Sequence, residues 1–154
     1  MLENLITSER IIPELEAKER WGAISEIIDF LVQDGAISPE NQEMVVSAIR
    51  RREETISTGI GFGIAIPHAS CECVSEVVTV FARSTQGIDF DSLDSTLIHF
   101  IVLFIVPKDQ FQDHLRTLAA IAKLLNDPVV RKEIAEAPDK ESIFQVFLNR
   151  SQNR

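Results

Sequence analysis

The feature that most restricts how this chain can fold is the run from Leu97 to Val106, in which His99 is the one residue that is not apolar. A strand of this composition has to be covered on both faces, because it offers no alternating polar positions to solvent. The stretch from Val77 to Ala82 is rich in β-branched residues and predicts a second central strand. Shorter strands are expected at Ile64–Ile66 and, at an edge where proline is tolerated, at Ile11–Ile12. Together these segments favour a sheet between two layers of helices.

Two helical patterns precede the central strands. Apolar residues recur from Trp21 to Leu31, and Gly35 lies where a left-handed residue would end that helix. Ser38 fits the N-cap of a second helix, and Pro39 suits its first position. The buried face of this helix is expected at Met44, Val45, Ala48 and Ile49. Its last turn is expected to be basic, with Arg50, Arg51 and Arg52.

Further helices are expected after the strands. The third carries an apolar stripe of Leu115, Leu118, Ala119, Ala122 and Leu125. Asp127 and Pro128 match the cap and first residue of a fourth helix, and Ile143, Phe144 and Phe147 mark the last. The order of elements predicts an α/β fold with three layers, α/β/α, and a mixed β-sheet between helices. Because no linker, repeat or composition shift divides residues 1–154, we expect a single domain.

The charge of the chain restricts its partners. Asp and Glu outnumber Lys and Arg by 24 to 15, and the formal net charge is −9. This balance argues against non-specific binding to nucleic acid or to an anionic membrane, because phosphate contacts require an excess of cations. The N-terminus shows no secretory signal, and the stretch from Ile98 to Pro107 is too short to cross a bilayer. We therefore expect a cytoplasmic protein without membrane insertion.

The segment from Ser57 to His68 reads STGIGFGIAIPH and carries the functional signal. Glycine permits sharp turns and close approach of main-chain amides to a bound group. Pro67 fixes its own φ, so the imidazole of His68 ends a stiff segment, where a neutral ring nitrogen can act as a nucleophile. The same spacing also fits a surface turn with an exposed histidine. It does not match a dinucleotide-binding or P-loop fingerprint.

The remaining histidines and the cysteines allow other interpretations. We expect His99 to be a hydrogen-bonded core residue, and the position of His114 alone predicts an exposed residue in the first turn of a helix. Cys71 and Cys73 do not suggest a structural disulfide, because such closely spaced residues close a small, strained loop. With His68 they form His-x-x-Cys-x-Cys, an alternative zinc or copper site for which no fourth ligand occurs at the usual spacing.

The STGIGFGIAIPH segment resembles the active-site signature of enzyme IIA of the fructose and mannitol class. This class belongs to the phosphoenolpyruvate-dependent sugar phosphotransferase system and includes stand-alone nitrogen-regulatory relatives. The likeness continues through the segments Gly87–Phe90 with Asp94, Val106–Pro107, His114–Leu115, Leu118–Ala119 and Leu124–Leu125. It runs from Leu2–Leu5 to the closing helix around Phe144.

The resemblance implies a role for each candidate site residue. His68 would be the phosphoryl acceptor, His114 its neighbour and Arg52 an active-site arginine. Ser57, Thr58 and Gly59 would help to hold the phosphate. Family members often carry glycine and a basic residue after the histidine, whereas this chain has Ala69–Cys73 there and lacks that basic residue. The implied fold is the three-layer α/β arrangement expected above.

The implied activity is that of a phosphohistidine-dependent phosphotransferase that needs no metal or nucleotide cofactor. The phosphoryl group would come from an HPr-type carrier protein and pass to a cysteine of an enzyme IIB, as in transport. Alternatively, phosphorylation of His68 would act as a regulatory signal to a target protein, because it adds about −1.5 to −2 charge. A stand-alone chain favours the nitrogen-type regulator, although transport IIA proteins can also be separate chains. A regulatory interaction protein without catalysis and the metal-binding module are the alternatives.

Overall fold

The structure is a computed structural model that describes residues 6–55, 59–90 and 96–152. Its centre is strand β6 (Ile98–Pro107), which is antiparallel to β5 (Val78–Ile88). On its other side β6 is parallel to two short strands in succession, β3 (Ile64–Ala65) and β4 (His68–Cys71). Strands β1 (Ile11–Ile12) and β2 (Gly59–Gly61) complete the sheet in the order β1-β5-β6-β3-β2, with β4 beside β6. The sheet is therefore mixed, as the sequence predicts.

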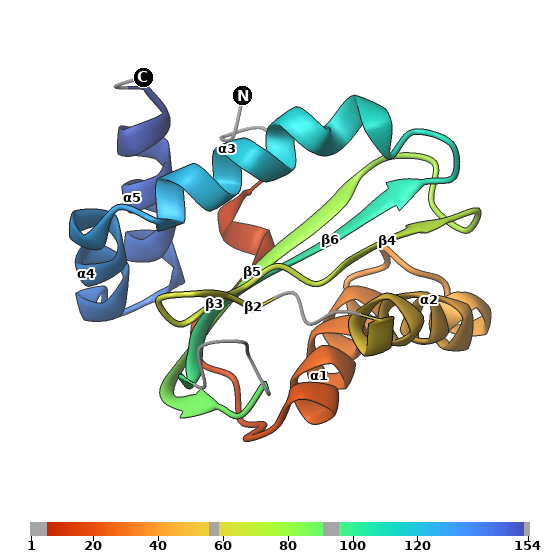
Figure 1. Ribbon diagram of the computed structural model, residues 1–154, viewed down its shortest axis with the longest axis horizontal. Coiled ribbons are helices and arrows are strands. Elements are labelled where there is room, and N and C mark those ends of the chain that lie inside the picture. The colour runs from red at the N-terminus through yellow and green to blue at the C-terminus, as the bar shows by residue number, and fades with distance from the viewer. Residues whose placement is uncertain (1–5, 56–58, 91–95, 153–154) are drawn as a thin grey trace.

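Helices cover both faces of this sheet (Figure 1). The first layer contains α1 (Arg20–Gln33) and α2 (Gln42–Thr55), and the second contains α3 (Leu115–Leu125), α4 (Pro128–Glu136) and α5 (Lys140–Gln152). Single 3₁₀ turns occur at η2 (Ser8–Arg10), η3 (Pro39–Asn41) and η4 (Gln112–His114). The three-layer α/β/α expectation is confirmed.

The apolar residues of β6 supply both cores. Ile101, Leu103 and Ile105 belong to the core beneath α1 and α2, whereas Phe100, Val102 and Phe104 belong to the core beneath α3, α4 and α5. This division follows from the alternation of side chains along a strand. Each such side chain contributes roughly 1.5–3 kcal/mol when fully buried, so β6 stabilises both layers at once.

Strand β5 is longer than the sequence predicts. It continues past Ala82 to Ile88 and includes the buried polar residues Arg83 and Ser84. The prediction ended the strand at Ala82, because Arg83 and Ser84 interrupt the apolar pattern. The hydrogen-bond partners of these polar residues lie far away in the sequence and could not be recognised from it. The main chain at Pro13, for example, accepts a hydrogen bond from Arg83 Nε at 2.9 Å.

The second helix differs from the prediction at both ends. It begins at Gln42 after the 3₁₀ turn, and the Ser38 side chain makes no capping hydrogen bond. Met44 is 51% exposed, whereas Val45 and Ile49 are buried, so Met44 was wrongly assigned to the buried face. Positions 45 and 49 are four residues apart and share one side of the helix, while position 44 is turned away from it. The helix also continues past the three arginines, which leaves Arg52 in its last turn.

Two of the predicted helix-end signals are confirmed. Gly35 follows α1 with φ +85°, and the Asp127 carboxylate accepts a hydrogen bond from the Val129 amide at 2.9 Å, as expected of a cap.

In α3 the fully buried residues are Ile121, Leu124 and Leu125, whereas Leu115 is 40% exposed. The predicted stripe was therefore wrong at Leu115 and at Ala119, which is also exposed. Within the described residues, no helix combines the length and the apolar character that spanning a membrane requires.

Two glycines with positive φ provide a test of this backbone. Gly35→Ala should cost about 1 kcal/mol of unfolding free energy, because φ is +85° but no atom lies within 4 Å of the added Cβ. Gly87→Ala should cost about 2–4 kcal/mol, because φ is +93° and the added Cβ would lie 2.9 Å from Leu97 Cβ. Urea unfolding of both variants measures the difference. Equal costs would contradict the packing described around Gly87.

Candidate functional site

The glycine-rich segment forms a hairpin and then the strand that carries His68. In β2 and β3, Gly59 pairs with Ala65 and Gly61 pairs with Ile64, and Phe62 has φ 57° at the turn between them. Strand β4 then begins at His68, which was not expected to lie in a strand. The predicted phosphate-binding residues Ser57 and Thr58 lie outside the described residues, and Gly59 is the first residue of β2.

The His68 ring is held on two sides. Its Nδ1 lies 2.8 Å from the carbonyl oxygen of Ile66, and its plane stacks on Phe111 with a centroid distance of 5.6 Å and an interplanar angle of 16°. A carbonyl oxygen can only accept a hydrogen bond, so Nδ1 carries the proton and donates it. In the neutral ring this leaves Nε2 with the free lone pair, which is the nucleophilic position.

A cavity of about 360 Å³ lies beside this ring, between α2 and the edge strand β4. The residues that line it are Ala48, Arg51 and Arg52 of α2, His68, Ala69 and Ser70 of β4, and Phe111. The structure thus brings together His68 and Arg52, which the sequence places 16 residues apart. Phe111 was missed by the sequence analysis, because a single aromatic residue in a loop gives no signal of its partner.

The burial of His68 favours its neutral form. The pKa of His68 is lowered, mainly because burial disfavours the imidazolium and also because the Arg52 guanidinium repels it. The hydrogen bond to the Ile66 carbonyl and the Glu53 carboxylate act in the opposite direction. Because Ala69 and Ser70 carry no charge, the cationic wall of the cavity comes from Arg51 and Arg52 rather than from the segment after the histidine.

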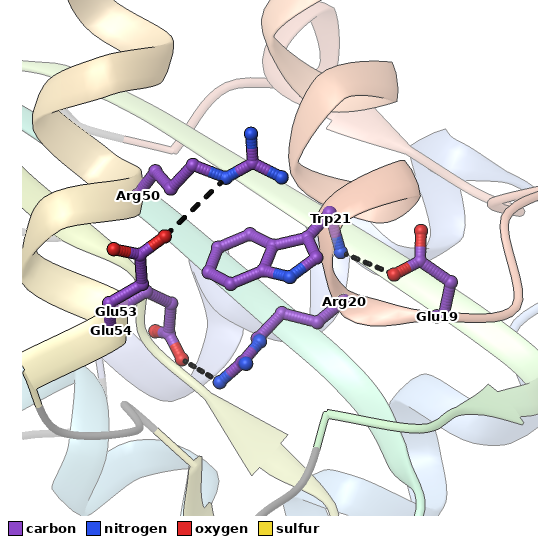
Figure 2. A network of polar contacts seen from close by, with 6 residues as sticks. All are labelled: Glu19, Arg20, Trp21, Arg50, Glu53 and Glu54. Atoms are coloured by element: carbon purple, nitrogen blue, oxygen red, sulfur yellow. Dashed lines mark hydrogen bonds and ion pairs between the residues drawn. The ribbon is translucent and has the colours of Figure 1, made fainter.

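A network of polar contacts fixes the end of α2 that carries Arg52 (Figure 2). The Trp21 ring at the start of α1 lies between two guanidinium groups, those of Arg20 at 4.2 Å and Arg50 at 4.6 Å. Glu53 is only 2% exposed and forms an ion pair with Arg20 at 3.4 Å, while Glu54 pairs with Arg50 at 3.8 Å. A buried carboxylate requires such a partner, so α1 and α2 are joined at the turn next to the cavity.

The other two histidines lie apart from this cavity. His114 ends η4 and packs edge-on against Phe104, with ring centroids 6.1 Å apart, but it is not among the cavity-lining residues. Phe104 is in turn the β6 partner of His68 in the sheet, so His114 lies close to the site without lining it. The expected hydrogen bond of His99 is confirmed, because its Nδ1 lies 2.8 Å from the Ser84 carbonyl oxygen. Its expected place in the core was wrong, because the residue is only half-buried.

The cysteine expectation was wrong, because Cys71 and Cys73 form a disulfide. Strand β4 ends at Cys71, and the turn that follows brings the two Cα atoms to 5.2 Å, within the usual range for a disulfide. The Cys73 amide also donates to Cys71 Sγ at 3.2 Å. Neither sulfur is then a thiolate that could bind zinc or copper with His68. Among the described residues, no group of three His, Cys, Asp or Glu side chains is arranged to hold a metal ion.

The arrangement around the cavity suits a bound oxyanion. Two arginines at its wall offer donors that match the geometry of phosphate oxygens, and the neutral imidazole offers a nucleophilic nitrogen beside them. Positioning and electrostatic stabilisation are the main requirements of phosphoryl transfer, because its transition state spreads charge over three equatorial oxygens.

Comparison with known proteins agrees with this chemistry. The family described as the phosphoenolpyruvate-dependent sugar phosphotransferase system, EIIA 2, matches residues 4–150. The chain is 36% identical over 126 residues to the PTS system fructose-specific EIIA component of Haloferax volcanii, covering 82% of this chain and 80% of that protein. It is 29% identical over 146 residues to a nitrogen regulatory protein of Bradyrhizobium diazoefficiens, covering 95% and 94%.

Two solved structures share the fold. The nitrogen regulatory protein IIA-Ntr of Neisseria meningitidis superimposes with a TM-score of 0.84 at 22% identity, over 94% of this chain and 97% of that one. Enzyme IIAMTL of Escherichia coli, solved in complex with phosphorylated enzyme IIBMTL, gives a TM-score of 0.76 at 21% identity, over 94% and 99%. With the match over residues 4–150, the chain belongs to the EIIA type 2 family of the phosphoenolpyruvate-dependent sugar phosphotransferase system.

Proposed function

We propose that this chain is a phosphocarrier in which Nε2 of His68 accepts a phosphoryl group from the phosphohistidine of an HPr-type protein. The observation that carries the proposal is the hydrogen bond from His68 Nδ1 to the Ile66 carbonyl, beside a cavity lined by Arg52. In the transfer, the P–N bond of the donor breaks as a P–Nε2 bond forms on His68. The proton stays on Nδ1, and the donor histidine regains its lone pair.

Arg52 is proposed to stabilise the phosphoryl oxygens during this step. Its guanidinium lines the cavity, and its donors can reach charge that develops on the equatorial oxygens. Glu53 and the Trp21 network hold the turn that carries it. His114, Ser57, Thr58 and Gly59 keep the roles that the family resemblance implies, as a neighbouring histidine and as phosphate-binding residues.

Two destinations are open to the phosphoryl group. We favour the nitrogen-type regulator, because the match to the nitrogen regulatory relative covers 95% of this chain and 94% of that protein. There, the charge added to His68 would change which target protein docks at the cavity. The other destination is a cysteine of an enzyme IIB, as suggested by the fructose-specific relative and by the IIAMTL complex with phosphorylated IIBMTL. In either role residues 1–154 would act as one IIA domain in the cytoplasm.

Intact-mass analysis tests the acceptor. After incubation with phosphoenolpyruvate, enzyme I and an HPr protein from the same source, the native chain should gain one acid-labile phosphoryl group, and His68→Gln should gain none. Lys140→Gln is the matched control, because it removes one positive charge from an exposed residue outside the cavity. A folded His68→Gln that is still phosphorylated would refute the assignment, as would a native chain that gains nothing from active components.

The titration of His68 tests the electrostatics of the site. Because the pKa of His68 is lowered, the nucleophilic neutral form should persist below pH 6.5, so the acid limb of the transfer rate should lie below that pH. Arg52→Gln removes a repelling charge and should raise this pKa, which would move the acid limb to higher pH. NMR titration of the His68 ring protons measures the pKa directly, with Lys140→Gln as control. A pKa that falls or stays constant in Arg52→Gln would contradict the placement of Arg52.

A binding experiment separates the two destinations. Phosphorylated protein should transfer its group to a IIB protein if it is a transport component, and the IIB should then carry a phosphocysteine. A regulator should instead co-purify with a target whose binding changes between the phosphorylated and unphosphorylated forms.

A further inference from the structure

A second cavity, of about 420 Å³, lies between β5, β6 and α4 and shares no lining residue with the cavity beside His68. Its charged and polar wall includes Arg83 of β5, His99 of β6 and two residues of α4, Arg131 and Lys132. Among the residues that the structure describes, no Asp or Glu lines it, although the chain as a whole has a net charge of −9. Positive charge is therefore concentrated in this cavity, although the protein as a whole is acidic.

Arg83 is the most constrained of these residues. It is 8% exposed, and its guanidinium donates to three main-chain carbonyl oxygens, those of Pro13 at 2.9 Å, Ile134 at 2.7 Å and Ala137 at 2.6 Å. These acceptors are neutral, and within residues 6–55, 59–90 and 96–152 no carboxylate forms an ion pair with Arg83. Buried charges are usually paired, so Arg83 contributes positive charge at the cavity without a protein counter-ion.

The His99 ring is fixed in its position beside this cavity. Its Nδ1 lies 2.8 Å from the Ser84 carbonyl oxygen, which makes Nδ1 the donor. The ring lies between two glycines, since a Cβ on Gly63 would come within 3.4 Å of His99 Cδ2 and a Cβ on Gly87 within 3.0 Å of Cε1. Nε2 is the ring nitrogen for which no hydrogen bond occurs among the described residues.

The wall from α4 supplies charge that is accessible. Arg131 donates one hydrogen bond to the Leu125 carbonyl at 2.9 Å, and its guanidinium lies over the Phe62 ring at 4.9 Å, while Lys132 is exposed. Thr85, which also lines the cavity, donates hydrogen bonds from its amide and its hydroxyl to the Glu14 carboxylate. Phe100 and Ala135 form the apolar part of the wall.

We propose that this cavity binds a small organic anion. Its acid group lies near the cationic groups of Arg83, Arg131 and Lys132, and its apolar body lies against Phe100 and Ala135. Charge-assisted hydrogen bonds give the site its preference for an acid, and the apolar wall gives it a preference over inorganic anions. The site does not depend on the proposed phosphorylation of His68, so the two proposals succeed or fail separately.

Calorimetric titration with three small probes tests the class of ligand. Benzoate carries both an acid and an apolar body, benzamide keeps the ring without the charge, and acetate keeps the single charge without the ring. Benzoate should bind about tenfold or more tightly than either of the other two. In parallel NMR spectra it should shift the ring signals of His99 and leave those of His68 in place. Equal binding of benzamide would overturn the anion preference, and equal or tighter binding of acetate would overturn the role of the apolar wall.

Matched variants locate the binding site. The double variant Arg131→Gln/Lys132→Gln should weaken benzoate binding by about tenfold or more, because it removes two accessible charges. Lys140→Gln, which changes an exposed cation outside the cavity, and Arg52→Gln, which changes the cavity beside His68, should leave benzoate binding unchanged. The proposal fails if benzoate leaves His99 unperturbed, if the folded double variant binds as tightly as the native chain, or if Arg52→Gln removes the binding.

Discussion

Strand β6 is the element on which the rest of the structure depends. Its side chains enter the two cores alternately, and its main chain pairs with β5 on one side and with β3 and β4 on the other. The pairing of Phe104 with His68 places the start of β4 at the edge of the sheet, beside α2. His99 of the same strand borders the second cavity. One buried strand therefore positions both candidate sites, although they share no lining residue.

The sequence predicted those features that depend on local pattern. The apolar run of β6, the left-handed Gly35 and the Asp127 cap are each determined by residues close to one another, and each is found in the structure. The exposure of Met44 was not predicted, because the side of α2 that is buried depends on how the helix packs against α1 and β4. The disulfide of Cys71 and Cys73 was missed because it depends on the turn after β4, which the spacing of the two cysteines does not reveal.

The candidate site was predictable in part. The STGIGFGIAIPH segment identified His68, and the family resemblance identified Arg52, which lines the same cavity. The stacking of Phe111 and the network around Trp21 join residues that are distant in the chain, so no local pattern could show them. The second cavity could not be predicted from the sequence for the same reason, because Arg83 and Arg131 come together only when β5 and α4 pack against each other.

The central claim is that the main chain at Ile66 selects Nε2 of His68 as the phosphoryl acceptor. Long-range ¹H–¹⁵N NMR of the uniformly ¹⁵N-labelled protein, phosphorylated through enzyme I and HPr, distinguishes the two ring nitrogens by their shifts and by coupling to phosphorus. We expect the phosphoryl group on Nε2, with the proton retained on Nδ1. A phosphoryl group on Nδ1, or on a residue other than His68, would contradict this account of the site.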